Sequence, residues 1–402
     1  MINDYNKRLG EREEEGSMSA RTWPTNGLSL AAFEAFKSIP FERIDFNDPI
    51  FDSIRADYPD LEEWRLRGLK SSCARCALVV RNSTKSYSGI AILKEGEGPA
   101  GPLSTGLKIS TFKVAAAAQA QGVADILLSK IFERAIQLEV DVLFVTVKPN
   151  HEDISRYFEL RGFRRASRYS VSGEHIYTAD IAHPERIYSG INRLAYDVLA
   201  EEYRIRSDSP GPNQESPEYL AGLLLSRLSK PVGRLLELGP GSGGVLAALE
   251  NSATETIAVE ISPKMAALST LIAPRALTIV GDILNIDFIE HSFDGIYAGA
   301  FLHLFPHAEA ASLLRRMARW TKPEGAVFVN TSISDQASQS IELKADYIHR
   351  VARFRSRWTE DQFRLLVESN GFRVLDRVTT DEQERGKFWV AFICTPTPNG
   401  GA

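Results

Sequence analysis

The sequence contains little cysteine and no long apolar run. Three cysteines among 402 residues are too few for a disulfide framework, which favours a reducing compartment. No stretch approaches the ~18 consecutive apolar residues of a membrane helix. The charged first residues lack the apolar core of a secretory signal, and residues 1–22 are predicted to form a disordered tail. We therefore expect a cytoplasmic protein that has no membrane partner.

The sequence also lacks a surplus of positive charge. Its net charge of -5 leaves no overall electrostatic footprint for a nucleic acid, so we do not expect such a partner. No internal repeat or low-complexity tract is present, and the length corresponds to roughly two to three domains. The chain is therefore expected to fold as more than one globular domain, with its oligomeric state left open.

One Cys-x-x-Cys pair, Cys73 and Cys76, is the pattern closest to a metal or redox site. A zinc site needs two more ligands, and Cys394 is remote in the sequence. A redox pair is one interpretation, and two buried small residues is the other, which we favour. No metal site is therefore expected.

The first half of the chain is arranged around a glycine-containing turn. A long amphipathic helix is predicted over residues 123–138, directly after Gln121-Gly122. Glycine and proline make residues 94–104 a predicted loop. Strands are predicted over residues 77–81, 88–93, 107–114, 142–147, 163–169 and 172–180, with a second helix over residues 153–161.

This order resembles the GNAT fold of acetyl-CoA-dependent N-acetyltransferases. Its most specific element is the family's Q/R-x-x-G-x-G/A loop, which here is Gln119-Ala-Gln-Gly-Val-Ala124; Leu160-Arg-Gly-Phe163 matches a second landmark. Backbone N–H groups at a helix start suit a pyrophosphate. The resemblance implies an α+β domain over residues 23–183, with acetyl-CoA as cofactor. The residues implied to bind it are Gln119, Gln121, Gly122 and Ala124.

The first half departs from that family's catalytic pattern at two positions. Phe158 stands where a tyrosine general acid is often found, so its neighbour Tyr157 becomes the candidate acid, with a half-buried aromatic as the alternative. The strand before the loop offers Ser110 and Thr111 in place of a carboxylate base. Acetyl transfer to an amine needs a base, directly or through water. The domain is therefore either an acetyltransferase or a non-catalytic module that binds CoA or recruits a substrate.

The second half is organised around residues 234–244. An apolar run ending at Leu238 predicts a buried strand. Gly239, Gly241 and Gly243 then turn the chain sharply and let a ligand approach the backbone. A helix starts directly afterwards, and its free N–H groups face that ligand. The stretch predicts a nucleotide-like ligand, and its Gly-x-Gly-x-x-Gly spacing also fits a dinucleotide.

The alternation of strands and helices that follows resembles the class I S-adenosylmethionine-dependent methyltransferases. Glu260 ends the second strand, where an acid can accept both ribose hydroxyls. Lys322-Pro-Glu-Gly325 resembles the family's turn before the fifth strand. The resemblance implies a Rossmann-like, seven-stranded α/β domain over residues 187–402, with S-adenosylmethionine as cofactor. The residues implied to bind it are Glu237, Gly239, Gly241, Gly243, Glu260, Met265, Asp282, Ile283 and Ala298.

Several of these residues have a second interpretation. Asp282 either binds the adenine or caps a turn, and Met265 either packs on the adenine or belongs to the core. A base is needed where the acceptor must lose a proton, and His303 has a suitable pKa, with Tyr203 as a second candidate. The alternative role for His303 is to shape the pocket.

A basic and aromatic insertion over residues 338–357 is predicted to lie over the acceptor. Tyr347, Arg353 and Arg355 within it, and Tyr196 in the helix that precedes the glycine turn, are the candidate substrate-binding residues. Arginines with interleaved aromatics suit a carboxylate, a phosphate or a stacked base. The alternative is a solvated strand with its arginines outward. We expect methylation of a small anionic or aromatic metabolite, such as a natural-product intermediate, which the first domain also acetylates; modification of RNA or protein is the alternative.

Overall fold

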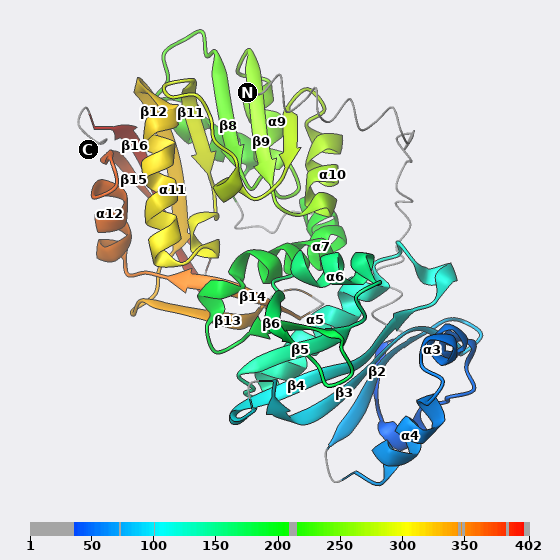
Figure 1. Cartoon of the computed structure of the whole chain (residues 1–402). Coiled ribbons are helices and arrows are strands. Elements are labelled where there is room, and N and C mark those ends of the chain that lie inside the picture. Colours follow the sequence, from blue (N-terminus) through cyan, green and yellow to red (C-terminus); the bar gives the residue numbers. More distant parts are fainter. Residues whose placement is uncertain are drawn as a thin grey trace.

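The chain forms two seven-stranded sheets, with a two-stranded hairpin between them (Figure 1). The computed structural model describes residues 36–71, 74–99, 101–208, 215–344, 347, 350–382 and 386–397. The predicted N-terminal tail and Cys73 lie outside these residues. Below, the first half denotes residues 36–183 and the second half residues 187–397.

The first sheet has the order β1-β2-β3-β4-β5-β7-β6. Strands β4 and β5 run parallel, and their pairing, from Gly106 opposite Val142 to Ile109 opposite Val145, stops before either strand ends. The strands therefore separate at their carboxyl ends, directly before α5. The elements of this half are β1 (Phe36–Pro40), η1 (Phe41–Arg43), η2 (Pro49–Phe51), α3 (Asp52–Asp57), α4 (Leu61–Leu69), β2 (Arg75–Arg81), β3 (Tyr87–Gly98), β4 (Gly101–Val114), η3 (Ala116–Ala118), α5 (Val123–Gln137), β5 (Val142–Val147), α6 (Glu152–Glu159), β6 (Arg164–Tyr169) and β7 (His175–Asp180).

The predicted loop over residues 94–104 is wrong. Strand β3 continues to Gly98 and β4 begins at Gly101, with Lys94 opposite Lys108 and Gly96 opposite Gly106. The backbone hydrogen bonds of this long hairpin outweigh the local preference of glycine for loops, because strand propensity depends strongly on the neighbouring strand.

The second sheet has the order β10-β9-β8-β11-β12-β16-β15. Its first five strands run parallel, and β16 pairs antiparallel with both β12 and β15. The apolar run of β8 is fully buried, as expected for a parallel strand covered on both faces. The elements of this half are η4 (Pro184–Arg186), α7 (Tyr188–Asp208), α8 (Pro217–Leu225), β8 (Arg234–Leu238), α9 (Gly244–Glu250), β9 (Glu255–Glu260), α10 (Pro263–Ile272), β10 (Leu277–Val280), η5 (Ile283–Asn285), β11 (Phe293–Ala298), η6 (Leu302–Leu304), α11 (His307–Trp320), β12 (Thr321–Ser332), β13 (Ser338–Lys344), β14 (Val351–Arg357), α12 (Glu360–Glu368), β15 (Phe372–Glu382) and β16 (Lys387–Pro396).

The hairpin β13–β14 and helix α7 join the two halves. Val351 and Phe354 of β14, like Ile191 and Leu194 of α7, belong to the apolar core of the first half. Arg353 points to the side of β14 opposite Phe354, because successive side chains of a strand alternate. In Figure 1 this hairpin lies between the two sheets, beside α7. The predicted insertion is therefore an antiparallel hairpin.

The prediction that this hairpin is a solvated strand is wrong. The arginines at its centre are almost fully buried, with Arg353 4% and Arg355 7% exposed. They are covered because β14 packs between the two halves. This packing could not be predicted from the sequence of either half alone.

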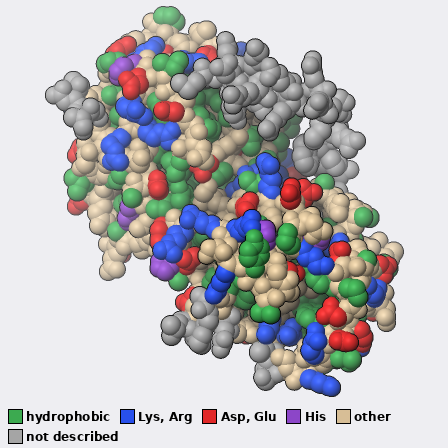
Figure 2. Space-filling view, viewed as in Figure 1, with side chains coloured by type: hydrophobic (Ala, Val, Ile, Leu, Met, Phe, Trp, Pro, Cys, Tyr) green, Lys and Arg blue, Asp and Glu red, His purple; other side chains and the backbone are tan. Residues whose placement is uncertain are grey.

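The described residues contain no helix that is both long and apolar enough to cross a bilayer. Across the same residues, no three side chains of His, Cys, Asp or Glu are grouped as a metal would require. Figure 2 shows acidic and basic side chains interspersed on the face in view. Cys76 is half-buried, and burial raises the pKa of its thiol.

We predict that Phe354→Ala destabilises the protein. The ring of Phe354 is fully buried in the core of the first half. Its removal leaves a cavity and should lower the free energy of unfolding by about 3–5 kcal/mol, measured by urea denaturation. Phe388→Ala is the control, because Phe388 is 42% exposed and should change the stability far less. Equal effects of the two substitutions would contradict the role of β14 in that core.

Candidate functional site

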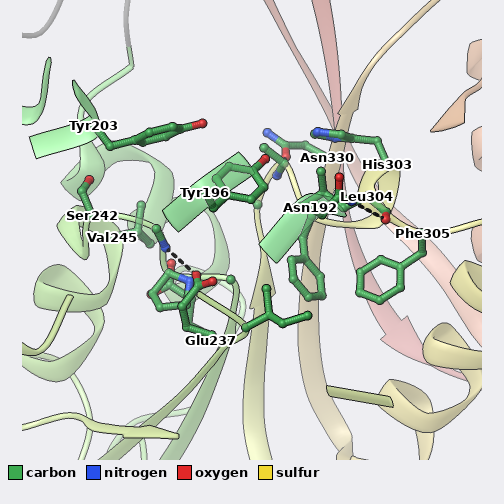
Figure 3. Close-up of a pocket in the computed structure, with 18 of the residues that line it drawn as sticks. Asn192, Tyr196, Tyr203, Glu237, Ser242, Val245, His303, Leu304, Phe305 and Asn330 are labelled. Atoms are coloured by element: carbon green, nitrogen blue, oxygen red, sulfur yellow. Dashed lines mark hydrogen bonds between the residues drawn. The ribbon is translucent and has the colours of Figure 1, made fainter. Parts of the chain in front are cut away.

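A cavity of about 380 Å³ opens where the parallel strands of the second sheet end (Figure 3). Its walls come from the turn after β8, the ends of β9 to β12, helix α7 and the hairpin β13–β14. The structure therefore brings most of the predicted site residues of the second half together. Those that line the cavity are Tyr196, Tyr203, Glu237, Gly239, Gly241, Glu260, Asp282, Ile283, His303, Tyr347, Arg353 and Arg355.

The glycine turn has the left-handed backbone that the sequence predicts. Gly239, Gly241 and Gly243 have φ of 68°, 57° and 93°. A Cβ at Gly239 would lie 2.5 Å from the ring of Phe301, and one at Gly243 would lie 2.7 Å from the Cα of Ser269. At Gly241 a Cβ would meet no described atom within 4 Å. Gly241 therefore leaves open space beside the backbone, and it lines the cavity.

Two buried carboxylates lie beside this turn. Glu237 at the end of β8 is 3% exposed and Glu260 at the end of β9 is 6% exposed. The N–H groups of Ser262 and Gly241 donate to Glu260, at 2.9 and 3.4 Å. Burial raises the pKa of Glu260 to about 7. Burial, together with the charge of Glu260, raises the pKa of Glu237 to about 8.

One oxygen of the Glu237 carboxyl group lacks a hydrogen-bond donor within the described part of the chain. Its Oε2 is buried and has no hydrogen-bond partner among the described residues. An orphaned carboxyl oxygen in a cavity wall is costly unless a donor binds there. Glu237 is therefore suited to accept hydrogen bonds from a cationic or hydroxyl-bearing ligand.

Asp282 follows β10 and makes two hydrogen bonds within the protein. The hydroxyl of Ser189 on α7 donates to its Oδ2 at 2.6 Å, and the N–H of Leu284 donates to its Oδ1 at 3.0 Å. Asp282 thus caps η5 and at the same time lines the cavity. Ile283, the next residue, is buried against the cavity as well.

Three predicted cofactor residues lie outside the cavity lining found for the described chain. Met265 and Ala298 are fully buried in the protein interior. Gly243 begins α9 and faces Ser269 of α10. The structure does not bring these residues to the cavity, and their roles toward a cofactor stay predictions.

His303 lies in η6 on the far side of the cavity from Glu237 (Figure 3). It is 3% exposed, and its Nδ1 has no hydrogen-bond partner within the described chain. Burial, and then the positive charges of Arg355 and Arg353, lower the pKa of His303 well below its ordinary value. The imidazole is therefore neutral at neutral pH, and the same charges weaken it as a base.

Three tyrosines form an aromatic wall. The rings of Tyr203 and Tyr347 stack with centroids 5.0 Å apart, and Tyr196 meets Tyr203 edge-on at 5.9 Å. Burial raises the pKa of Tyr203 well above its ordinary value, so this phenol is a poor base near neutral pH. The wall offers a flat apolar surface to a bound molecule.

The buried arginines share one carboxylate. Glu342 of β13 lies 3.7 Å from both Arg353 and Arg355, and it also pairs with Arg357. Arg355 donates to the hydroxyl of Ser332. Burial, and then the charge of Arg353, lower the pKa of Arg355 to about 10. At this end of the site, three arginines thus share one glutamate.

Sequence reasoning missed two asparagines of the cavity wall. Asn330 near the end of β12 accepts a hydrogen bond from the N–H of Ala300. Asn192 on α7 donates to the carbonyl of Leu304 at 3.0 Å and accepts from the N–H of Phe354 at 2.8 Å. Asn330 could have been predicted, because ligands bind at the carboxyl ends of buried parallel strands and this residue is polar and lies near such an end. No local sequence pattern indicated Asn192.

The first half has a cavity of its own, of about 300 Å³, where β4 and β5 separate. Glu174 in the turn between β6 and β7 lines it and accepts a hydrogen bond from Tyr58 at 3.0 Å. Lys108 of β4 also lines it, and burial lowers the pKa of its ammonium group while Glu174 opposes this. Glu174 thus supplies a carboxylate to the cavity beside β4, the strand that has no carboxylate base of its own. Sequence reasoning missed this residue.

The predicted anion loop of the first half leads into α5. Gly122 has φ of 79° and directly precedes Val123, and residues 119–121 are exposed. The ammonium of Lys264, on α10 of the second half, would lie 3.0 Å from a Cβ at Gly122. The residues described as lining the two cavities do not include the predicted acetyl-CoA-binding residues Gln119, Gln121, Gly122 and Ala124.

Tyr157 is half-buried against the core of the first half and is not among the residues described as lining either cavity. Its hydroxyl donates to Asp125 at 3.2 Å, and Arg161 stacks on its ring at 3.8 Å. Burial, and then the charge of Asp125, raise its pKa well above the ordinary value. Phe158, its neighbour, lines the cavity of the first half.

Comparison with known proteins identifies part of the second half. A model of the methyltransferase-domain family matches residues 236–329, from β8 to β12. The second half therefore contains a methyltransferase domain with a Rossmann-like α/β sheet, and the match supports S-adenosylmethionine as its cofactor.

A curated relative is the biotin biosynthesis bifunctional protein BioHC of Cellvibrio japonicus, 26% identical over 235 residues. The match covers 54% of this chain and spans 45% of the relative's length. Among solved structures, the chain is similar to 1,6-didemethyltoxoflavin-N1-methyltransferase of Burkholderia thailandensis, with 19% identity, a TM-score of 0.42, and coverage of 52% of this chain and 89% of that one. It is also similar to the [4+2]-cyclase SpnF, with 15% identity, a TM-score of 0.42, and coverage of 52% and 96%.

We predict that Glu237→Gln flattens the pH dependence of stability. Folded Glu237 binds a proton more tightly than the unfolded chain does, so the wild-type free energy of unfolding should fall as pH rises from about 5 to about 8. The glutamine variant loses this contribution and keeps that of Glu260, whose pKa is about 7. At pH 8 it should be more stable than the wild type by roughly 2–5 kcal/mol, while the two converge near pH 5.

Urea denaturation without added ligand measures this difference. Glu324→Gln, which alters an exposed carboxylate of β12, should leave the wild-type profile unchanged. Parallel profiles for Glu237→Gln and the wild type would show that Glu237 is ionised in the folded protein at neutral pH.

Proposed function

We propose that the second half is an S-adenosylmethionine-dependent methyltransferase that acts on a small molecule. The observation that carries this proposal is the orphaned carboxyl oxygen of Glu237, in the wall of a cavity that Gly241 also lines. An acid and a left-handed glycine at the end of the first parallel strand fit the ammonium and carboxylate of a bound amino acid. The family match over residues 236–329 supports the same assignment.

The residues of the cavity fit the parts of this cofactor. Glu237 and the backbone of the glycine turn would hold the methionine end, Glu260 the ribose hydroxyls, and Asp282 with Ile283 the adenine. When bound, S-adenosylmethionine supplies an electrophilic methyl group. The chain's contribution is to hold the acceptor in line with that group and to exclude water. Holding the two reactants in this geometry lowers the entropic part of the reaction barrier.

His303 is the candidate base of this site. It lines the cavity and has an unused nitrogen that can accept the N–H or O–H proton of an acceptor, although its lowered pKa makes it a weak base. The raised pKa of Tyr203 makes it a wall of the acceptor pocket rather than a base. Tyr196, Tyr347, Arg353 and Arg355 would bind the acceptor.

For the first half we propose a GNAT-like acetyl-CoA-binding domain over residues 23–183, next to a methyltransferase domain over residues 187–402. Its support is the parallel pair β4 and β5, which separates over a cavity, and the left-handed Gly122 at the start of α5. Glu174 is placed to take the proton of an attacking amine, directly or through water. The alternative is a module that binds CoA without catalysis, which the burial of Tyr157 favours.

We predict that Gly241→Val weakens binding of S-adenosylmethionine. A valine there is strained at φ of 57°, by about 1–2 kcal/mol, and its side chain enters the space that the donor would occupy. Titration calorimetry should show tight binding to the wild type and at least about a tenfold loss in the variant.

Gly173→Val is the matched control. Gly173 also has a positive φ, of 78°, with no described atom within 4 Å of its Cβ position, and it lies in the first half. Its variant should bind S-adenosylmethionine as the wild type does. Equal affinity for Gly241→Val and the wild type, or no heat with the wild type, would contradict the methyltransferase proposal.

We predict that Glu174→Gln slows acetyl transfer from acetyl-CoA to small primary amines by about 10²–10⁴-fold, because it removes the base. Calorimetry should show unchanged binding of acetyl-CoA. Glu159→Gln, at an exposed residue of α6, should keep full activity. Binding of acetyl-CoA to the wild type with no transfer to any amine would instead favour the non-catalytic module.

A further inference from the structure

Positive charge is concentrated at one end of the second-half cavity. Arg353 and Arg355 of β14 and Lys344 of β13 all line it and are less than a tenth exposed, and Lys387 and a further acid, Glu382, line the cavity as well. Each of these cations lowers the pKa of His303, so their fields overlap at the same place. The acids Glu237, Glu260 and Asp282 lie at the other end, beside the glycine turn.

Glu342 offsets the charge of the two arginines only in part. It lies 3.7 Å from Arg353 and from Arg355, a distance longer than a hydrogen bond, and its shortest contact is with Arg357. Arg353 bonds to Tyr196 and Arg355 to Ser332 through other nitrogens, but the Nε atoms of both are buried and lack a hydrogen-bond partner in the described chain. Buried charges and donors left in this state are costly unless a ligand satisfies them.

The aromatic residues around the arginines are arranged so that a small ligand could bind between them. The aromatic wall of Tyr196, Tyr203 and Tyr347 borders the same cavity. In Figure 3, Tyr196 lies between Glu237 and the region of His303 and Asn330. A molecule bound at the arginines therefore lies across the cavity from the carboxylate that would hold the donor, as an acceptor must.

We propose that the methyl acceptor is a small anion whose carboxylate or phosphate group is bound by Arg353 and Arg355. Guanidinium groups bind both groups through paired, charge-assisted hydrogen bonds. The tyrosines hold the body of the acceptor, and His303 lies next to it. This inference rests on the proposed methyltransferase function and adds the class of its substrate.

Calorimetry on the full chain saturated with S-adenosylhomocysteine tests the proposal, with benzoate, phenyl phosphate and neutral benzamide as probes. Benzoate or phenyl phosphate should bind at least about tenfold more tightly than benzamide, and whichever is tighter identifies the anionic group. Arg353→Met and Arg355→Met should each weaken that binding by about tenfold or more. Arg350→Met, which removes an exposed arginine just before β14, should bind the anion as the wild type does.

Two results would overturn the proposal: equal affinities of the wild type for benzamide and the anions, or equal affinities of Arg353→Met, Arg355→Met and Arg350→Met for the anion. The wild-type comparison holds even where a variant fails to fold, which circular dichroism detects. Absence of heat with S-adenosylhomocysteine alone would contradict the proposed methyltransferase instead, so the two failures are distinguishable.

Discussion

Two hydrogen bonds of Asn192 determine how the cavity of the second half is assembled. This asparagine of α7 is 4% exposed, donates to the carbonyl of Leu304 and accepts from the N–H of Phe354. The first bond fixes the segment that carries His303, and the second fixes the strand that carries the arginines. One turn further along the same helix, Tyr196 enters the cavity. Helix α7 therefore positions the candidate base, the arginines of β14 and part of the aromatic wall.

A chain of polar contacts also connects the two halves. The N–H of Ser262 donates to Glu260, and the Ser262 hydroxyl donates to Asp197 of α7 at 2.6 Å. Lys264, two residues further on, approaches Asp125 of α5 at 3.7 Å, and Arg161 donates to the same carboxylate. The acid proposed to bind the ribose and the helix proposed to bind a pyrophosphate are thus linked by direct contacts through α10 and α7.

The parts of this structure that sequence reasoning predicted are the locally determined ones. The apolar run of β8, the left-handed glycines after it and the acid at the end of β9 each follow from a few adjacent residues. The extended hairpin of β3 and β4 was missed because pairing with a neighbouring strand decided it. Asn192, Glu174 and the burial of Arg355 depend on contacts between segments far apart in the sequence, so no local pattern contained them.

The packing of β14 does not follow the order of the chain. By sequence this strand and α7 belong with the second sheet, while Val351 and Phe354 of one and Ile191 and Leu194 of the other complete the core of the first. A cut between the halves near residue 184 would leave apolar surface exposed on both pieces. The two sheets are therefore not interchangeable modules joined by a linker, and a rearrangement that replaced one of them would have to rebuild the core of its neighbour.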